Sequence, residues 1–194
     1  MIKKYFFLVG VLLLFIVSLI FDKSIVLFVT SFRLPFLDLV FKGITYLGSF
    51  IFVLFFISSL FLWHEKKREW ILPFWFGLGL AAFLTFVIKM MILRPRPEVI
   101  GVIALVTSTT LYSFPSGHSS TAFSALPVMD IGFPKLKYLW IIIAVLVALS
   151  RLYLGMHYLS DIIAGAVLGY YCGYLMIKLK NRKWFKKINL FTKT

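Results

Sequence analysis

Long apolar stretches recur along the whole chain and decide what it can fold into. A helix needs about 20 apolar residues to cross the hydrocarbon core of a membrane, with a range of roughly 17–25. Such runs lie at 5–21, 44–63, 70–93, 138–154 and 159–179, and a shorter, weaker run at 119–133 contains Pro127 and Asp130. The sequence therefore predicts an all-α fold, an integral membrane bundle of six transmembrane helices.

The composition argues against a soluble chain. Hydrophobic residues make up 61% of the 194 residues and charged residues only 14%, whereas a soluble domain carries about 25% charged residues. The net charge of +14 would favour nucleic acid in a soluble protein, but here the positive charges flank apolar runs, so no nucleic-acid partner is expected. The single cysteine, Cys172, excludes an internal disulfide and a CxxC metal motif. No repeat or linker divides the chain, so one domain over 1–194 is expected.

Two segments next to the apolar runs need a separate interpretation. The first run, 5–21, resembles a signal peptide, but no cleavage site follows it, so we expect a retained signal anchor. The segment 24–43 is too interrupted to cross, and we predict an amphipathic helix at the membrane interface. The interrupting residues are Arg33, Pro35, Asp38 and Lys42.

The lysines and arginines predict the orientation. Most of them fall in segments that six crossings place on one side of the membrane: Lys3, Lys4, Lys66, Lys67, Arg68, Lys135, Lys137 and the end of the chain. The positive-inside rule makes that side cytoplasmic. We therefore expect a multi-pass protein of the cell membrane with both termini in the cytoplasm. The basic tail 180–194 is interpreted as a stop-transfer tail with interfacial anchors, and docking to anionic membrane lipids is the alternative.

Several ionisable side chains stand inside or beside the apolar runs, where they are costly and mark a functional site by default. They come from three separated segments: Lys89 and Arg96, then His118, then Arg151, His157 and Asp161. Alternating crossings place all three segments at the same, extracytoplasmic face. Taken singly, each residue also fits a structural role, such as an interfacial lysine or a histidine–aspartate hydrogen bond. Their joint occurrence at one face favours a site.

The cations in this set predict an anionic ligand. Lys89, Arg96 and Arg151 outnumber the nearby acids, and arginine forks suit phosphate oxygens. Ser116 and Gly117 precede a predicted helix start, where free backbone N–H groups also favour phosphate.

The histidines in the set predict phosphoryl transfer. His157 and Asp161 are spaced i, i+4 and so share one helical face. An aspartate that accepts from one imidazole nitrogen leaves the other as a nucleophile. His118 then remains to donate a proton to the leaving oxygen.

Three sequence patterns carry a family resemblance. Lys89-x6-Arg96-Pro97, Pro115-Ser116-Gly117-His118 and Ser150-Arg151-x5-His157-x3-Asp161 resemble the signature of the type-2 phosphatidic acid phosphatase family, which shares its site with the vanadium-dependent haloperoxidases. The resemblance implies a lipid phosphatase that needs no metal and no cofactor. His157 would be the nucleophile that forms a phosphohistidine, Asp161 its orienting partner and His118 the general acid. The phosphate would be bound by Lys89, Arg96, Ser116, Gly117 and Arg151. Arg94-Pro95 offers a second Arg-Pro, so a shared role for Arg94 stays open.

The resemblance implies a lipid phosphate as substrate, and we favour a polyprenyl diphosphate. Phosphatidylglycerophosphate, phosphatidic acid and lipid A phosphates are the alternatives. A phosphotransferase would share the phosphohistidine step and differ in the acceptor. A non-catalytic lipid or anion transporter is the alternative of another class, and the intact His118, His157 and Asp161 argue against it. The sequence predicts no oligomeric state.

Overall fold

The computed structural model describes residues 2–107, 110–180 and 182, which form a helical bundle. Its α-helices are α1 (Ile2–Ser31), α2 (Pro35–Tyr46), α3 (Phe50–Trp63), α4 (Ile71–Ile92), α5 (Gly117–Gly132), α6 (Lys137–Tyr153) and α7 (Leu159–Leu179). Three short 3-10 helices join them: η1 (Glu65–Trp70), η2 (Pro97–Ile100) and η3 (Pro134–Leu136). The predicted all-α class is confirmed.

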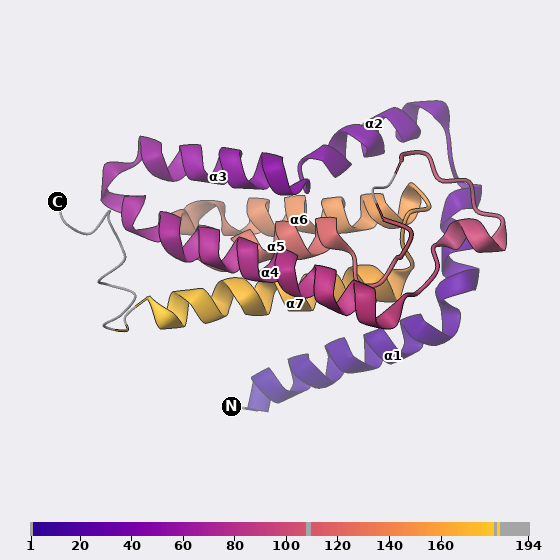
Figure 1. Cartoon of the computed structure of the whole chain (residues 1–194), viewed down its shortest axis with the longest axis horizontal. Coiled ribbons are helices and arrows are strands. Elements are labelled where there is room, and N and C mark those ends of the chain that lie inside the picture. Colours follow the sequence, from indigo (N-terminus) through magenta and orange to yellow (C-terminus); the bar gives the residue numbers. More distant parts are fainter. Residues whose placement is uncertain (1, 108–109, 181, 183–194) are drawn as a thin grey trace.

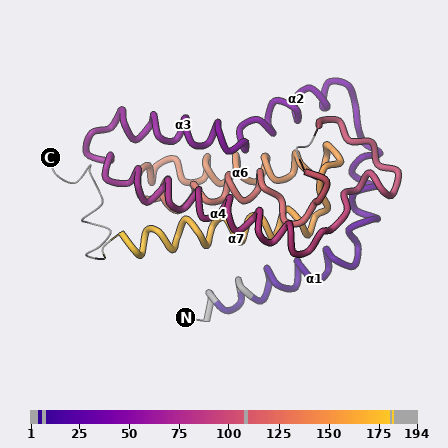
Figure 2. Tube along the Cα trace, viewed as in Figure 1, coloured from indigo at the N-terminus to yellow at the C-terminus, as the bar shows by residue number. Residues whose placement is uncertain are grey.

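Helix α5 forms the centre of the bundle and packs against α4, α6 and α7 (Figure 1). Helices α3 to α7 run along the long axis, while α1 diverges from the bundle toward its N-terminal end. Buried apolar side chains of α3, α4 and α5, among them Phe61, Phe74 and Met129, form a core cluster. The tube in Figure 2 shows that the turn between α1 and α2 and the loop between α4 and α5 lie at the same end of the molecule.

Helices α5 and α7 approach closely along a line of glycines. A Cβ atom at Gly169 or Gly173 would overlap a backbone oxygen of α5, and one at Gly165 would overlap the carbonyl oxygen of Ser116, the residue before α5. Small residues at this spacing let two membrane helices come together. These three glycines of α7 therefore form a packing face against α5.

We expect Gly169→Ala to destabilise the protein, because the added methyl group meets the backbone of Ser120 and not a movable side-chain tip. Overpacking of this kind costs about 1–3 kcal/mol. Thermal unfolding in detergent, followed by circular dichroism, measures the effect. The matched control is Gly79→Ala, which adds the same methyl group to helix α4 with no atom within 4 Å. Equal unfolding temperatures for the two variants would contradict the close packing.

Four segments are long and apolar enough to span a membrane: Val9–Ser31, Glu65–Ile92, Pro134–Tyr153 and Leu159–Leu179. A fifth crossing results if α2 and α3, which are bent by 61° at the break between them, act as one broken span. Together with the helical bundle, these segments identify a multi-pass membrane protein. The count of six crossings stays a prediction, because α5 lies in the bundle but is not among the segments that are long and apolar enough to span a membrane.

The helix boundaries differ from the predicted spans. Helix α1 continues to Ser31, past the predicted end at residue 21, because Asp22 is buried against the bundle and does not end the helix. The segment 24–43 is consequently divided between α1 and α2, and α2 begins at Pro35, a residue suited to the first turn. The second crossing was expected to begin at residue 44, which lies in α2. Residues 181 and 183–194 of the predicted basic tail lie outside the described residues.

Candidate active site

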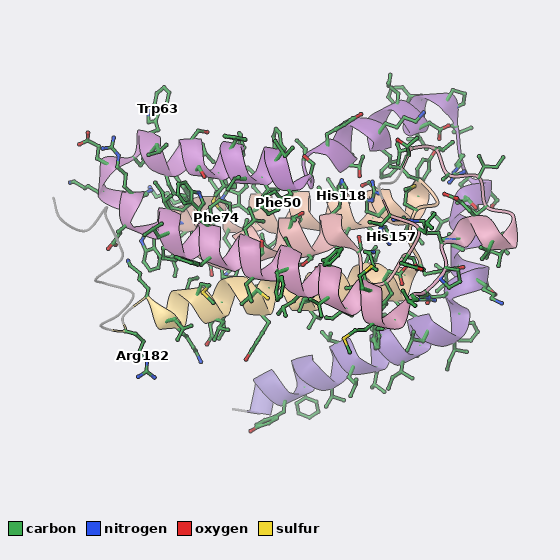
Figure 3. The ribbon with its side chains drawn as sticks, viewed as in Figure 1. Phe50, Trp63, Phe74, His118, His157 and Arg182 are labelled. Atoms are coloured by element: carbon green, nitrogen blue, oxygen red, sulfur yellow. The ribbon has the colours of Figure 1, made fainter. Side chains whose placement is uncertain are left out.

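Four helix ends meet at one end of the bundle and bring the predicted site residues together. Lys89 lies in the last turn of α4 and Arg151 in the last turn of α6. His118 lies in the first turn of α5 and Asp161 in the first turn of α7. His157 lies in the turn that connects α6 to α7. Figure 3 shows His118 and His157 at this end, with Trp63 and Arg182 at the other.

A cavity of about 380 Å³ lies between these helix ends. Most of the predicted set lines it: Lys89, Arg96, Gly117, His118, Arg151 and His157. Ser116 and Asp161 do not line the cavity and are fully buried. Thr85 and Thr110 also line it, although the sequence patterns did not single them out.

The imidazole of His157 is arranged as a neutral base. Its Nδ1 lies 3.5 Å from Asp161 Oδ2, which leaves Nε2 as the nitrogen turned away from the carboxylate. Burial, together with the nearby Arg151 and Arg96 guanidinium groups, holds the pKa of the His157 imidazole well below its usual range. The ring is therefore neutral at physiological pH, which is the form that a nucleophile needs.

Arg151 is the cation with a donor left for a ligand. Its side chain is buried, and Nη1 donates to Thr45 Oγ1 at 2.7 Å. Its Nε has no hydrogen-bond partner among the described residues. A buried donor of this kind is costly unless a ligand satisfies it. The guanidinium at the cavity wall therefore fits an anion.

Lys89 and Arg96 bind backbone carbonyls beside the cavity. Lys89 Nζ donates to the carbonyls of Tyr112, Ser113 and Pro115 at 2.9, 3.2 and 3.1 Å, which holds the loop that leads into α5. Arg96 Nη1 donates to the Met156 carbonyl at 2.7 Å. These cations consequently shape the site through the loop and the turn, and their charge makes the cavity attractive to an anion.

The start of α5 lies at the cavity. Ser116 is the N-cap residue, and its hydroxyl accepts from Ser119 N at 3.5 Å. Its own N–H donates to the Asp161 carbonyl at 3.0 Å and so ties α5 to α7. Gly117 opens the helix and lines the cavity, where the positive end of the helix dipole favours an anion.

Arg94 lies on the other side of Asp161 and does not line the cavity. Its guanidinium donates to Asp161 Oδ1 at 2.7 Å, to Ser160 Oγ at 2.6 Å and to Asp22 Oδ2 at 2.8 Å. Of the two Arg-Pro pairs, the geometry therefore places Arg96 at the cavity and Arg94 in an ion-pair network behind it. Asp22 and Thr45 are the partners that the sequence reasoning missed. Asp22 directly follows the first apolar run, where an aspartate also fits an ordinary helix end.

The described residues contain no group of three or more His, Cys, Asp or Glu side chains able to hold a metal ion. The side-chain donors that line the cavity are three cations, two histidines and several threonine hydroxyls. Such a set suits a phosphate, whose charge would otherwise need a divalent cation.

Comparisons with known proteins agree with this chemistry. The model of the PAP2 superfamily matches residues 70–185. Phosphatidylglycerophosphatase B of Bacillus subtilis is 34% identical over 167 residues, which cover 76% of this chain and 77% of that protein. Undecaprenyl-diphosphatase of Sulfolobus acidocaldarius is 30% identical over 148 residues, covering 71% and 68%.

Two solved structures have the same fold. The first transmembrane PAP2-type phosphatidylglycerolphosphate phosphatase from Bacillus subtilis gives a TM-score of 0.72 at 27% identity, over 94% of this chain and 98% of that one. Aquifex aeolicus LpxE gives a TM-score of 0.73 at 28% identity, over 81% of this chain and 94% of that one.

Proposed function

This chain belongs to the PAP2 superfamily, and from that premise we propose that it removes the terminal phosphate of a lipid phosphate or diphosphate through a phosphohistidine. The single observation that carries the proposal is the cavity in which His157 and His118 stand together with Arg151. The neutral His157 faces the cavity with Asp161 behind it, and the cations supply the charge that a phosphoryl group needs.

The first half of the reaction transfers the phosphoryl group to the enzyme. Nε2 of His157 attacks phosphorus and forms a P–N bond while the bond from phosphorus to the lipid oxygen breaks. His118, which carries a proton once the anionic phosphate is bound beside it, gives that proton to the lipid oxygen. The lipid then leaves as an alcohol or, from a diphosphate, as a monophosphate. Asp161 stabilises the positive charge on the imidazole ring of His157, since its Oδ2 lies beside Nδ1. Arg151 stabilises the charge on the equatorial oxygens.

The second half returns the enzyme to its starting state. A water molecule attacks phosphorus, the P–N bond breaks, and inorganic phosphate leaves with His157 neutral again. His118, deprotonated in the first half, takes the proton of the water. An alcohol in place of water would make the same site a phosphotransferase. The cations perform the role of a metal ion throughout, and the proposed reaction is metal-independent.

The proposed substrate is a polyprenyl diphosphate, with phosphatidylglycerophosphate, phosphatidic acid and lipid A phosphate as alternatives. Support comes from the names of the relatives: an undecaprenyl-diphosphatase and a phosphatidylglycerophosphatase. The cavity recognises the phosphate group that all these lipids share. We further propose that the site faces the extracytoplasmic side and that both termini are cytoplasmic, which rests on the positive-inside rule. A transporter would need the cations but not His118 and His157 at one cavity.

Phosphate release by the purified protein in detergent with excess EDTA tests the proposal. We expect release from at least one of a polyprenyl diphosphate, phosphatidylglycerophosphate and phosphatidic acid, unchanged by the chelator. Vanadate is expected to inhibit, because it mimics the five-coordinate transition state. Activity that EDTA abolishes and a divalent cation restores would refute the metal-free mechanism. Binding of these lipids without any release would favour the transporter.

A further inference from the structure

Helix α1 carries a buried carboxylate, Asp22, in a largely apolar sequence. Asp22 is 2% exposed, and both of its oxygens accept hydrogen bonds from the site end of the bundle. Oδ1 accepts from Ser160 N at 2.9 Å. Oδ2 accepts from Arg94 Nη2 at 2.8 Å and from the Ser160 hydroxyl. Helix α1 passes the start of α7 at this point (Figure 2).

Arg94 joins Asp22 to Asp161. Its Nη2 donates to Asp22, while its Nη1 donates to Asp161 Oδ1 at 2.7 Å. The guanidinium also lies over the ring of Tyr158, 4.2 Å from the centroid. Burial alone would lower the pKa of the Arg94 guanidinium, but the carboxylates of Asp161 and Asp22 outweigh it and raise that pKa. Arg94 is thus a fixed cation between two acids.

The same contacts fix the rotation of the Asp161 carboxylate. Oδ1 is bound to Arg94, and Oδ2 accepts from Tyr158 N at 2.9 Å. Oδ2 is also the oxygen that lies 3.5 Å from His157 Nδ1. A continuous path therefore runs from Asp22 through two ion pairs with Arg94 to Asp161, and ends at the close approach of Asp161 Oδ2 to the His157 imidazole.

We propose that Asp22 is a positioning residue for phosphoryl transfer, which acts through Arg94 to hold the Asp161 carboxylate against His157. This proposal rests on the proposed function. With Asp22 present, the charge of Arg94 is shared between two carboxylates. Without it, Arg94 pairs with Asp161 alone, and that carboxylate is drawn toward the guanidinium and stabilises the charged imidazole less. Helix α1 then contributes to the active site as well as to the membrane anchor.

Stability alone is a weak reason for this network. Buried ion pairs often contribute little, because the cost of removing the charges from water cancels their attraction. Apolar contacts already hold α1 against the bundle: Val26 is fully buried and packs with Val102, Ala148 and Leu152. A network of charges that ends beside the nucleophile instead supports a role in orienting the Asp161 carboxylate.

Steady-state kinetics of Asp22→Asn, Arg94→Gln and the double variant test the proposal on a lipid phosphate that the wild type hydrolyses. We expect Asp22→Asn to lower kcat about 10–100-fold, the usual cost of losing a group that orients a site residue. KM should hold within about twofold, because Asp22 does not line the cavity. Vanadate inhibition should weaken in parallel with kcat, since vanadate resembles the transition state. The double variant should match Arg94→Gln alone, since both changes break one path.

The matched control is Ser18→Ala, a buried polar residue one turn earlier on α1 whose hydroxyl bonds to Phe15 O of its own helix. It should leave kcat unchanged. Wild-type kcat in Asp22→Asn, or kcat losses that multiply in the double variant, would overturn the proposal. If Asp22→Asn does not fold, Asp22→Glu takes its place: it keeps the charge but displaces the carboxylate, and kcat must again fall while KM is retained. An inactive wild type would instead refute the proposed function.

Discussion

Replacing His157 with asparagine is expected to lower phosphate release by about 10³-fold or more while the protein stays folded. The amide of asparagine puts a neutral polar group near the place of Nδ1, which lies 3.5 Å from Asp161 Oδ2. The Nε2 atom that would form the P–N bond is lost, and removal of a nucleophile costs the covalent route entirely. Initial rates of phosphate release and thermal unfolding, measured on the same preparation, separate lost chemistry from lost structure.

The control for this variant is His64→Asn. His64 is exposed and lies between the C-terminal end of α3 and the start of η1. It should keep wild-type activity. If His157→Asn retained more than about a tenth of wild-type release, His157 would not be the nucleophile, because losing the covalent route lowers the rate far more than tenfold.

Replacing Arg151 with glutamine is expected to lower kcat/KM by about 10²–10³-fold, the usual cost of one donor that stabilises transition-state charge. The side chain is buried at the cavity, and its Nε has no partner among the described residues. Vanadate inhibition should weaken in parallel, since vanadate resembles the transition state. Kinetics with the preferred lipid and vanadate titration measure both effects.

Two further variants define what Arg151 contributes. Arg151→Lys keeps the charge but loses the planar fork, so we expect recovery of part of the loss only. Arg68→Gln removes an arginine from the η1 segment, where its Nε donates to Leu62 O, and should leave kcat/KM unchanged. Full activity of Arg151→Lys would mean that charge alone suffices. Full activity of Arg151→Gln would remove Arg151 from the proposed phosphate site.

The convergence of the site could be predicted from hydropathy and charge. Alternating crossings predict that Lys89, His118 and Arg151 lie at the same face of the membrane, and this needs no knowledge of contacts. In the structure, the three residues line one cavity. Helix α5 was predicted from a short apolar run that contains Pro127 and Asp130. Its buried face carries serines such as Ser120 and Ser124. Their small size is what allows α7 to pack so closely, which a scan for apolar runs does not reveal.

The network behind the site could not be predicted. Asp22 and Arg94 are far apart in sequence, and each borders an apolar run in a way that also fits an ordinary helix end. Only the packing of α1 against the start of α7 shows that they form an ion pair. The hydrogen bonds of Lys89 could not be predicted either. A lysine in such a motif indicates a bound anion, whereas here its Nζ donates to three backbone carbonyls of the loop.

Trapping the phosphoenzyme is the most direct test of the central claim. The purified protein would be mixed with a terminally radiolabelled lipid phosphate that it hydrolyses, and then denatured at alkaline pH, where a phosphohistidine survives. In the wild type, we predict label on the peptide that contains His157. The variant His157→Asn should carry no label. In His118→Asn, the labelled intermediate should accumulate if loss of His118 slows its hydrolysis more than its formation. Label on His118, or no label while wild-type release continues, would contradict the account.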